Sequence, residues 1–154
     1  MNRILRGKYP ALKAPPHELN INGQARAVLV GGNLSILYSL QGTPWGLQTE
    51  DRILFIEEVG EQFYHLDRML RNLQLSGKLQ GLKGMIVGGL TSMKDKKRPF
   101  GKNGEEIIRE YVEDLGIPVS FGFPAGHVEN NEPFILGRVV EYVVEDGGTV
   151  LRYE

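Results

Sequence analysis

Short apolar runs that alternate with amphipathic stretches constrain the fold of this chain more than any other feature. Residues 52–56 and 84–90 are rich in β-forming side chains and have the length of buried strands. Apolar side chains recur at helical spacing in the stretches that follow them, residues 62–75 and 105–115. Because strands that alternate with helices usually pair in parallel, we expect an α/β fold with a mostly parallel central sheet.

The flanking segments predict antiparallel strands in addition. Residues 19–21 and 25–30 indicate two short strands joined at Asn22-Gly23, and a helix follows Asn33, which can cap it. A further strand is expected over 119–123. Two longer β segments, 134–144 and 149–153, are joined by a glycine-rich turn and predict a hairpin. We therefore expect hairpins or an antiparallel layer beside the parallel sheet.

Composition narrows the possible functions. The chain has 154 residues, 41% of them hydrophobic and 24% charged, which indicates one globular domain. It has no cysteine, so disulfides, zinc–thiolate sites and a cysteine nucleophile are excluded. A net charge of −1 argues against a nucleic-acid partner, and the basic run at 94–98 indicates a solvated loop. No apolar run approaches the roughly 20 residues that a membrane span needs.

The start of the chain differs in character from the rest. Residues 1–13 carry basic side chains but lack the apolar region of a signal peptide. Three prolines within residues 1–18 indicate an extended, linker-like lead-in of the kind that joins two domains. We therefore divide the chain into this lead-in and one domain over 19–154.

Glu57 and Glu58 come at the end of an expected buried strand, where ligands bind in open α/β folds. Strand alternation sends the two carboxylates to opposite sides, so one can face a cleft while the other faces solvent or a helix. His127 follows another expected strand, on a loop rich in glycine and proline, and is a candidate general base. Each residue alone also fits an ordinary surface position.

Taken together, Glu57 and His127 could converge at one sheet edge as two thirds of a Ser–His–acid triad. The nucleophile is missing, because Gly-x-Ser-x-Gly does not occur. Ser35, Ser76 and Ser120 fall in elements where a structural role is expected.

The remaining histidines and glycines indicate no cofactor. His65 is expected on a helix, at its surface or in local packing, and His17 is expected to be solvated in the lead-in. Glu57, Glu58, His65 and His127 have no recognised metal-ligand spacing, so we expect no metal site. The Gly31-Gly32 pair lacks the residues that complete a phosphate-binding loop.

Five motifs carry a family resemblance. In order they are Gly31-Gly32-Asn33-Leu34-Ser35, Gly42-Thr43-Pro44-Trp45, Ile53-Leu54-Phe55-Ile56-Glu57-Glu58-Val59-Gly60-Glu61, Leu66-Asp67-Arg68-Met69-Leu70 and Gly122-Phe123-Pro124-Ala125-Gly126-His127. From about Leu19 to its end, the chain resembles the C-terminal domain of the LD-carboxypeptidases. These serine peptidases include muramoyl-tetrapeptide carboxypeptidase and the microcin-C-immunity peptidases.

The resemblance implies a swivelling β/β/α domain that supplies the Glu and His of a Ser–Glu–His triad. Those roles carry over to Glu57 and His127, with Glu58 as the fallback acid. The family removes a terminal D-alanine from cell-wall tetrapeptides in the cytoplasm during peptidoglycan recycling, needs no cofactor and often forms homodimers.

The expected partners are thus a peptide ending in D-alanine and an N-terminal domain that carries the serine. That domain is absent from these 154 residues, so we expect this chain alone to be inactive. A non-catalytic ligand-binding or regulatory α/β domain is the alternative, and under it Glu57 and His127 need not approach each other.

Overall fold

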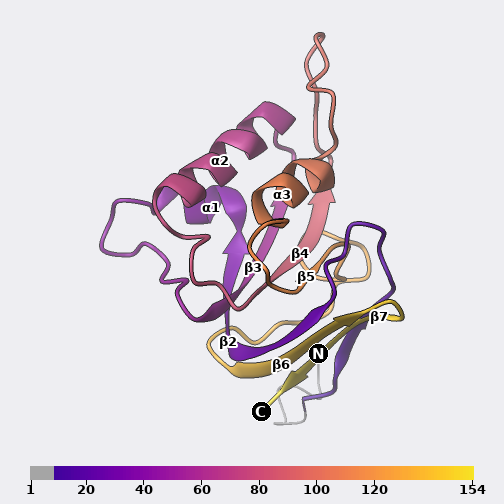
Figure 1. Ribbon diagram of the computed structural model, residues 1–154. Helices are drawn as coiled ribbons and strands as arrows, with labels where there is room; N and C mark the ends of the chain where they lie inside the picture. Colours follow the sequence, from indigo (N-terminus) through magenta and orange to yellow (C-terminus); the bar gives the residue numbers. More distant parts are fainter. Residues whose placement is uncertain (1–8) are drawn as a thin grey trace.

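The computed structural model describes residues 9–154, which form one mixed seven-stranded sheet with three helices (Figure 1). The strands are β1 (Leu12–Ala14), β2 (Gly23–Asn33), β3 (Arg52–Val59), β4 (Gly84–Thr91), β5 (Val119–Ser120), β6 (Val139–Glu145) and β7 (Gly148–Tyr153). The helices are α1 (Leu34–Ser39), α2 (Phe63–Leu75) and α3 (Gly104–Val112). In space the strands lie in the order β1-β7-β6-β2-β3-β4-β5.

The long strand β2 joins a parallel half of the sheet to an antiparallel half. Its first part, from Gly23 to Val28, pairs antiparallel with β6, and its second part, from Val28 to Asn33, pairs parallel with β3. β4 and β5 continue the parallel half, whereas β7 and β1 continue the antiparallel half. The mostly parallel core and the C-terminal hairpin are therefore confirmed, and the antiparallel strands belong to the same sheet.

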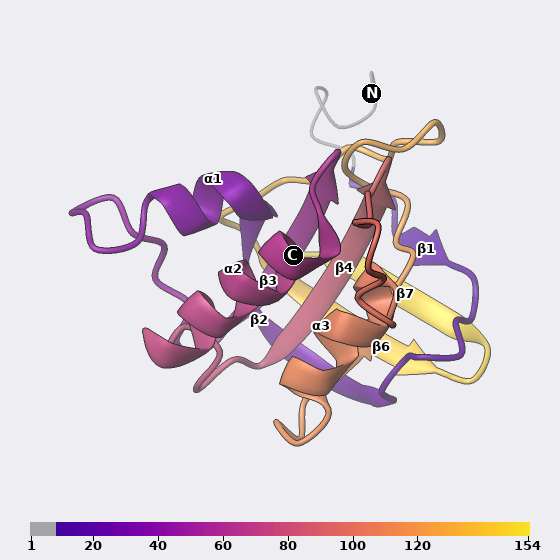
Figure 2. The same ribbon diagram turned by 90° about the horizontal axis from the view of Figure 1, so that it is seen from above.

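The three helices lie together on one side of the parallel strands (Figures 1 and 2). Helix α2 packs with the buried side chains Leu66, Met69, Leu70 and Leu73, a face close to the one that the sequence predicts. A second buried cluster, which includes Leu29, Phe55 and Tyr142, fills the opposite face of the sheet. Apolar side chains on both faces explain why the central strands are almost continuously hydrophobic.

Several boundaries differ from the sequence prediction. Residues 19–21 form no strand and make only one bridge, from Ile21 to Val119. β5 is only two residues long, and β6 begins at Val139 because the segment before it runs as a loop over the sheet. β3 continues through Glu57 and Glu58 to Val59, so both carboxylates lie within the strand. The strands predicted too long share a cause, because apolar side chains also occur in loops that pack on a core. β3 was predicted too short because buried charged residues are rare within strands.

The predicted lead-in contains a strand that the sequence analysis missed. β1 lies at Leu12–Ala14 and pairs with the C-terminal strand β7, so this part of the segment is built into the sheet. The predicted lead-in runs over residues 1–18, and its first part, residues 1–8, lies outside the described residues.

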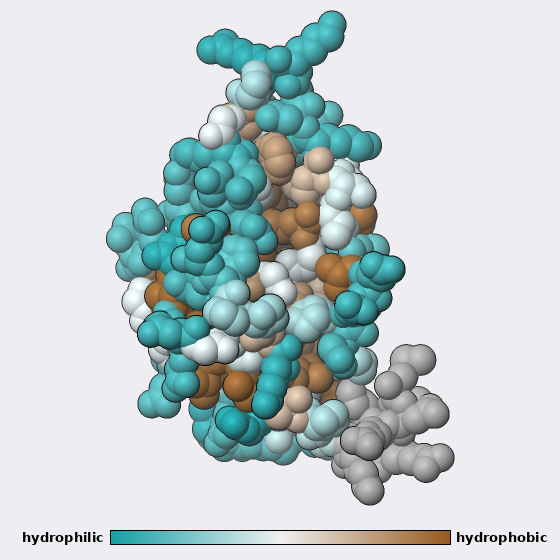
Figure 3. Space-filling model, turned by 90° about the vertical axis from the view of Figure 1, so that its right-hand side faces the viewer, coloured by the Kyte–Doolittle hydropathy of each residue, from teal (hydrophilic) through white to brown (hydrophobic). Residues whose placement is uncertain are grey.

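The loop between β4 and α3 projects from the body of the domain (Figure 1). Residues 94–98 within it are exposed, as the sequence predicts, and hydrophilic side chains gather at its tip (Figure 3). Within residues 9–154, no helix has the length and apolar character needed to cross a membrane.

Candidate active site

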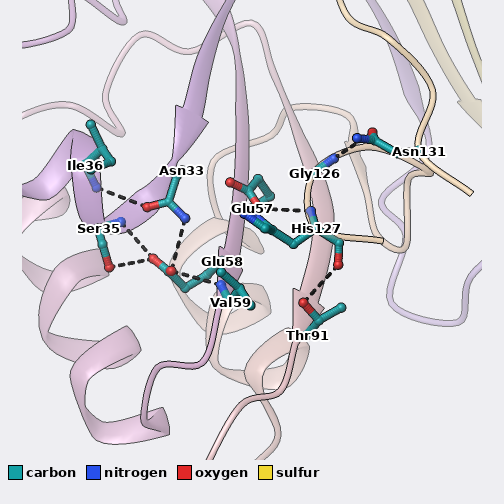
Figure 4. A network of polar contacts seen from close by, with 10 residues as sticks. All are labelled: Asn33, Ser35, Ile36, Glu57, Glu58, Val59, Thr91, Gly126, His127 and Asn131. Atoms are coloured by element: carbon teal, nitrogen blue, oxygen red, sulfur yellow. Dashed lines mark hydrogen bonds and ion pairs between the residues drawn. The ribbon is translucent and has the colours of Figure 1, made fainter. Parts of the chain in front are cut away.

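Glu57 and Glu58 are neighbours on β3, and their side chains point to opposite sides of the strand (Figure 4). Glu57 points toward the loop that carries His127, whereas Glu58 points toward the start of α1. Both residues are buried, with relative exposures of 5% and 2%. The strand alternation predicted from the sequence is therefore observed, and it gives the two carboxylates different surroundings.

The Glu57 carboxylate contacts His127 twice. Its Oε2 atom lies 2.6 Å from Nδ1 of the imidazole and also accepts the backbone N–H of His127 at 3.2 Å. The Glu57 side chain is 6% exposed, whereas the His127 side chain is 56% exposed. Nδ1 faces the carboxylate, and the opposite ring nitrogen, Nε2, has no hydrogen-bond partner within residues 9–154.

The His127 loop lies against the end of β4. The N–H of Phe123 donates to Val87, and the carbonyl of Ala125 accepts the N–H of Gly89 at 3.0 Å. Further along, the side chain of Asn131 accepts the N–H of Gly126 at 3.2 Å. These bonds hold the histidine beside the strand that neighbours Glu57.

An irregularity in the β3–β4 pairing makes room for this loop. Ile56 pairs with Val87 but Glu58 pairs with Leu90, so β4 has one extra residue opposite Glu57. The bulge falls at Gly88-Gly89, and a Cβ atom at Gly88 would lie 2.4 Å from the carbonyl oxygen of Ala125. Bulges often occur beside active sites, where they redirect a side chain or a neighbouring segment.

A glycine is also required in the loop itself, at Gly126. Its φ is +99°, in the region that side-chain-bearing residues rarely adopt, and a Cβ atom there would lie 2.7 Å from Cβ and Cγ of Glu57. The glycine of the Gly126-His127 pair therefore lets the loop approach the carboxylate.

The negative charge beside it raises the pKa of His127. The largest contribution is the hydrogen bond to Glu57, followed by the Coulombic attraction of Glu57 and, more weakly, that of Glu58. A carboxylate that fixes the tautomer of an imidazole and stabilises its protonated form is the arrangement found in Ser–His–acid triads. The pair is thus suited to take up a proton at Nε2 and release it again.

Glu58 has a different set of partners. Its Oε2 accepts the N–H and the hydroxyl of Ser35 at 2.8 and 2.7 Å, and its Oε1 accepts from the Asn33 amide at 3.1 Å and the Val59 N–H at 2.9 Å. The three donors from Asn33 and Ser35 tie β3 to the start of α1, whereas Val59 belongs to β3 itself. The geometry therefore favours Glu57 over the fallback acid Glu58 as the partner of His127.

The three candidate serines have structural contacts. Ser35 donates to Glu58, the hydroxyl of Ser76 donates to the carbonyl of Leu73, and Ser120 accepts the Tyr142 hydroxyl at 2.8 Å. Across residues 9–154, no serine hydroxyl is hydrogen-bonded to the His127 ring.

The other two histidines lie apart from the Glu57–His127 pair. His65 lies on α2 and pairs with Glu61 at 2.6 Å. The expectation of a solvated His17 was wrong, because its ring stacks on Phe121 at 5.7 Å between centroids. In the described part of the chain, no three His, Asp or Glu side chains form a group that could hold a metal ion.

Sequence reasoning missed the residues that hold the His127 loop and those that bind Glu58. Asn131 follows His127 by four residues and is one of two adjacent asparagines, a pattern that indicates only a turn. Ser35 appeared only as a poor nucleophile candidate, although its hydroxyl and N–H bind Glu58. The glycine pair of the bulge was the available signal, since isolated glycines within a strand often mark bulges.

The comparisons with known proteins show the family of this chain. The model of the LD-carboxypeptidase C-terminal domain matches residues 26–142. The probable murein peptide carboxypeptidase of Bacillus subtilis (strain 168) is 38% identical over 119 residues, which cover 77% of this chain and 37% of that protein. The murein tetrapeptide carboxypeptidase of Pseudomonas aeruginosa is 30% identical over 142 residues, 90% of this chain and 44% of that protein.

Solved structures match in fold as well. The crystal structure of muramoyltetrapeptide carboxypeptidase from Oxalobacter formigenes superposes with a TM-score of 0.88 at 26% identity, covering 99% of this chain and 52% of that one. The fold is that of a carboxypeptidase-type α/β domain. The chain belongs to the LD-carboxypeptidase C-terminal domain family. It spans between 37% and 44% of the length of the two curated relatives described above.

Proposed function

We propose that this chain is the C-terminal part of a serine-type LD-carboxypeptidase that removes the terminal D-alanine of cell-wall tetrapeptides. The observation that carries the proposal is the contact of 2.6 Å between Oε2 of Glu57 and Nδ1 of His127. The substrate class follows from the relatives, one of which is named a murein tetrapeptide carboxypeptidase. Peptidoglycan recycling in the cytoplasm is the setting that we propose for this activity.

The proposed reaction begins with proton transfer. His127 accepts the proton of a serine hydroxyl at Nε2 while the serine oxygen attacks the carbonyl carbon of the terminal amide. Glu57 holds the imidazole by Nδ1 and stabilises the positive charge that develops on it. His127 then gives the proton to the nitrogen of the departing D-alanine, and an acyl-enzyme remains.

Water completes the cycle, with His127 again as the base and then the acid. His127 accepts a proton from water, the resulting hydroxide attacks the acyl carbonyl, and the proton returns to the serine oxygen as the shortened peptide leaves. Both half-reactions use one imidazole in both protonation states. The exposed position of His127 and its buried acid partner suit that role.

We further propose that the serine lies in a part of the enzyme outside these 154 residues. Two observations support this. The relatives are more than twice as long as the region that they share with this chain. Ser35 and Ser120, which the sequence analysis considered, are both bonded elsewhere. On this proposal residues 1–154 alone hydrolyse no tetrapeptide.

The alternative is a binding or regulatory domain without catalysis. That alternative does not require Glu57 and His127 to lie within hydrogen-bond distance, but the two side chains are in contact. The contact therefore favours the peptidase over the alternative.

D-alanine release from a murein tetrapeptide tests the proposal. The longest reading frame that contains this chain is expressed, and initial rates are compared for the wild type, His127→Ala and the matched control His17→Gln. We expect release by the wild type and the control, and a loss of roughly 10³-fold or more for His127→Ala. Residues 1–154 alone should release none. Equal rates for the wild type and His127→Ala would refute the catalytic assignment.

A further inference from the structure

Thr91 makes an unusual pair of contacts at the end of β4. Its hydroxyl donates to the backbone carbonyl of His127 at 2.9 Å (Figure 4). Its own carbonyl accepts the N–H of Gly60 at 2.9 Å, just beyond the end of β3. One residue thus binds both the strand that carries Glu57 and the residue that Glu57 contacts.

His127 depends on its backbone for its position, because more than half of its side chain is exposed. Glu57 holds the N–H of His127 on one side of the residue, and Thr91 holds the C=O on the other. Fixing both ends of the residue limits the directions in which its ring can point. The contact of 2.6 Å at Nδ1 requires such a limit, since hydrogen bonds weaken steeply with misalignment.

We propose that Thr91 is a positioning residue, whose hydroxyl holds the His127 backbone so that the imidazole stays aligned with Glu57. The importance of this alignment for catalysis rests on the proposed function. The alignment itself is a property of the domain and can be measured without activity. A single hydrogen bond at a partly exposed position contributes little to overall stability. Its effect should therefore be seen in the Glu57–His127 pair rather than in the unfolding free energy.

Three variants of residues 1–154 separate alignment from general loop stability. Thr91→Val removes the hydroxyl but keeps the shape and the strand preference of threonine, so the strand should be retained. Thr91→Ser restores the hydroxyl. Thr43→Val is the matched control, because the Thr43 hydroxyl also donates to a backbone carbonyl, that of Leu40 at 2.7 Å, in an exposed loop.

NMR titration of His127 provides the first measurement. In the wild type Glu57, and more weakly Glu58, raise the pKa of His127. We expect Thr91→Val to lower that pKa toward the ordinary histidine value, and Thr91→Ser and Thr43→Val to leave it as in the wild type. Unchanged resonances of His17 and His65 show that the fold is intact.

Amide exchange provides the second measurement. The N–H of His127 should exchange roughly three- to tenfold faster in Thr91→Val, as expected when one hydrogen bond that restrains the residue is lost. A Thr91→Val variant with the wild-type pKa and the wild-type exchange rate of His127 would overturn the inference. Neither readout requires peptidase activity, so failure of the proposed function in the D-alanine assay is distinguishable from failure of the alignment.

Discussion

The two sides of β3 place adjacent glutamates in opposite circumstances. On one side, Glu58 accepts four hydrogen bonds, three from Asn33 and Ser35 at the start of α1 and one from its neighbour Val59 on β3. On the other side, Glu57 accepts two hydrogen bonds, and both come from His127, seventy residues away in sequence. Both carboxylates are buried, so burial does not distinguish them.

The difference lies in what the partners can do. The donors of Glu58 are amides and a hydroxyl that keep their protons at ordinary pH, so this carboxylate serves as a fixed tie between β3 and α1. The partner of Glu57 is an imidazole, a group that can gain and lose a proton, on a side chain that is mostly exposed. The titratable, exposed partner marks Glu57 as the carboxylate suited to chemistry.

The largest expected effect separates the two glutamates by rate. In the complete enzyme, Glu57→Gln should lower kcat for D-alanine release roughly 10³- to 10⁴-fold, because the amide no longer stabilises protonated His127. Glu58→Gln should lower it less than about tenfold per folded molecule, since Glu58 has no hydrogen bond to His127 in the described residues. Initial rates with a murein tetrapeptide measure both. Similar losses in the two variants would break the comparison.

The free energy of unfolding should depend more on Glu58 than on Glu57, the reverse of the order expected for the rate. Glu58→Ala leaves four donors without their acceptor and should lower the free energy of unfolding by about 2–4 kcal/mol. Glu57→Ala removes two hydrogen bonds beside an exposed ring and should cost about 1 kcal/mol. Urea denaturation of residues 1–154, followed by circular dichroism, gives both values. A Glu57→Ala loss as large as that of Glu58→Ala would contradict the structural role of Glu58.

The sequence predicted the parallel half of the sheet well and the edges poorly. β3 and β4 are buried on both faces, so each is a continuous apolar run that indicates a strand without knowledge of its partners. β1 and β5 are short edge strands whose pairing depends on partners distant in sequence, Leu151 and Met85. Local patterns contain little information about such pairing.

Part of the candidate site could also be predicted. Strand alternation on β3 was enough to place Glu57 and Glu58 on opposite faces. Positions after two expected strands, together with the motif resemblance, connected Glu57 with His127, but the residues that hold His127 could not be found in this way. Thr91 and Asn131 act through single hydrogen bonds to a loop backbone, and the course of that loop cannot be read from local sequence patterns.

The smallest expected effect, a graded change in the pKa of His127, tests the comparison most directly. Glu57 is the main cause of the raised pKa and Glu58 the weakest of the contributing charges. NMR titration of residues 1–154 should therefore show a large fall of this pKa in Glu57→Gln and a small one in Glu58→Gln. Equal falls would mean that the net charge near the ring, rather than the specific contact with Glu57, controls the pKa of His127.

The same pKa fixes the sign of a stability effect. Because the folded-state pKa of His127 is raised, the protonated histidine stabilises the fold. That contribution is fully present below the unfolded-state value of about 6.5 and disappears as pH rises through the folded-state value. Urea midpoints measured across this window should fall with pH in the wild type. The part of that fall due to His127 should be missing in Glu57→Gln and retained in Glu58→Gln, because only the first variant removes the partner that binds the proton-bearing ring.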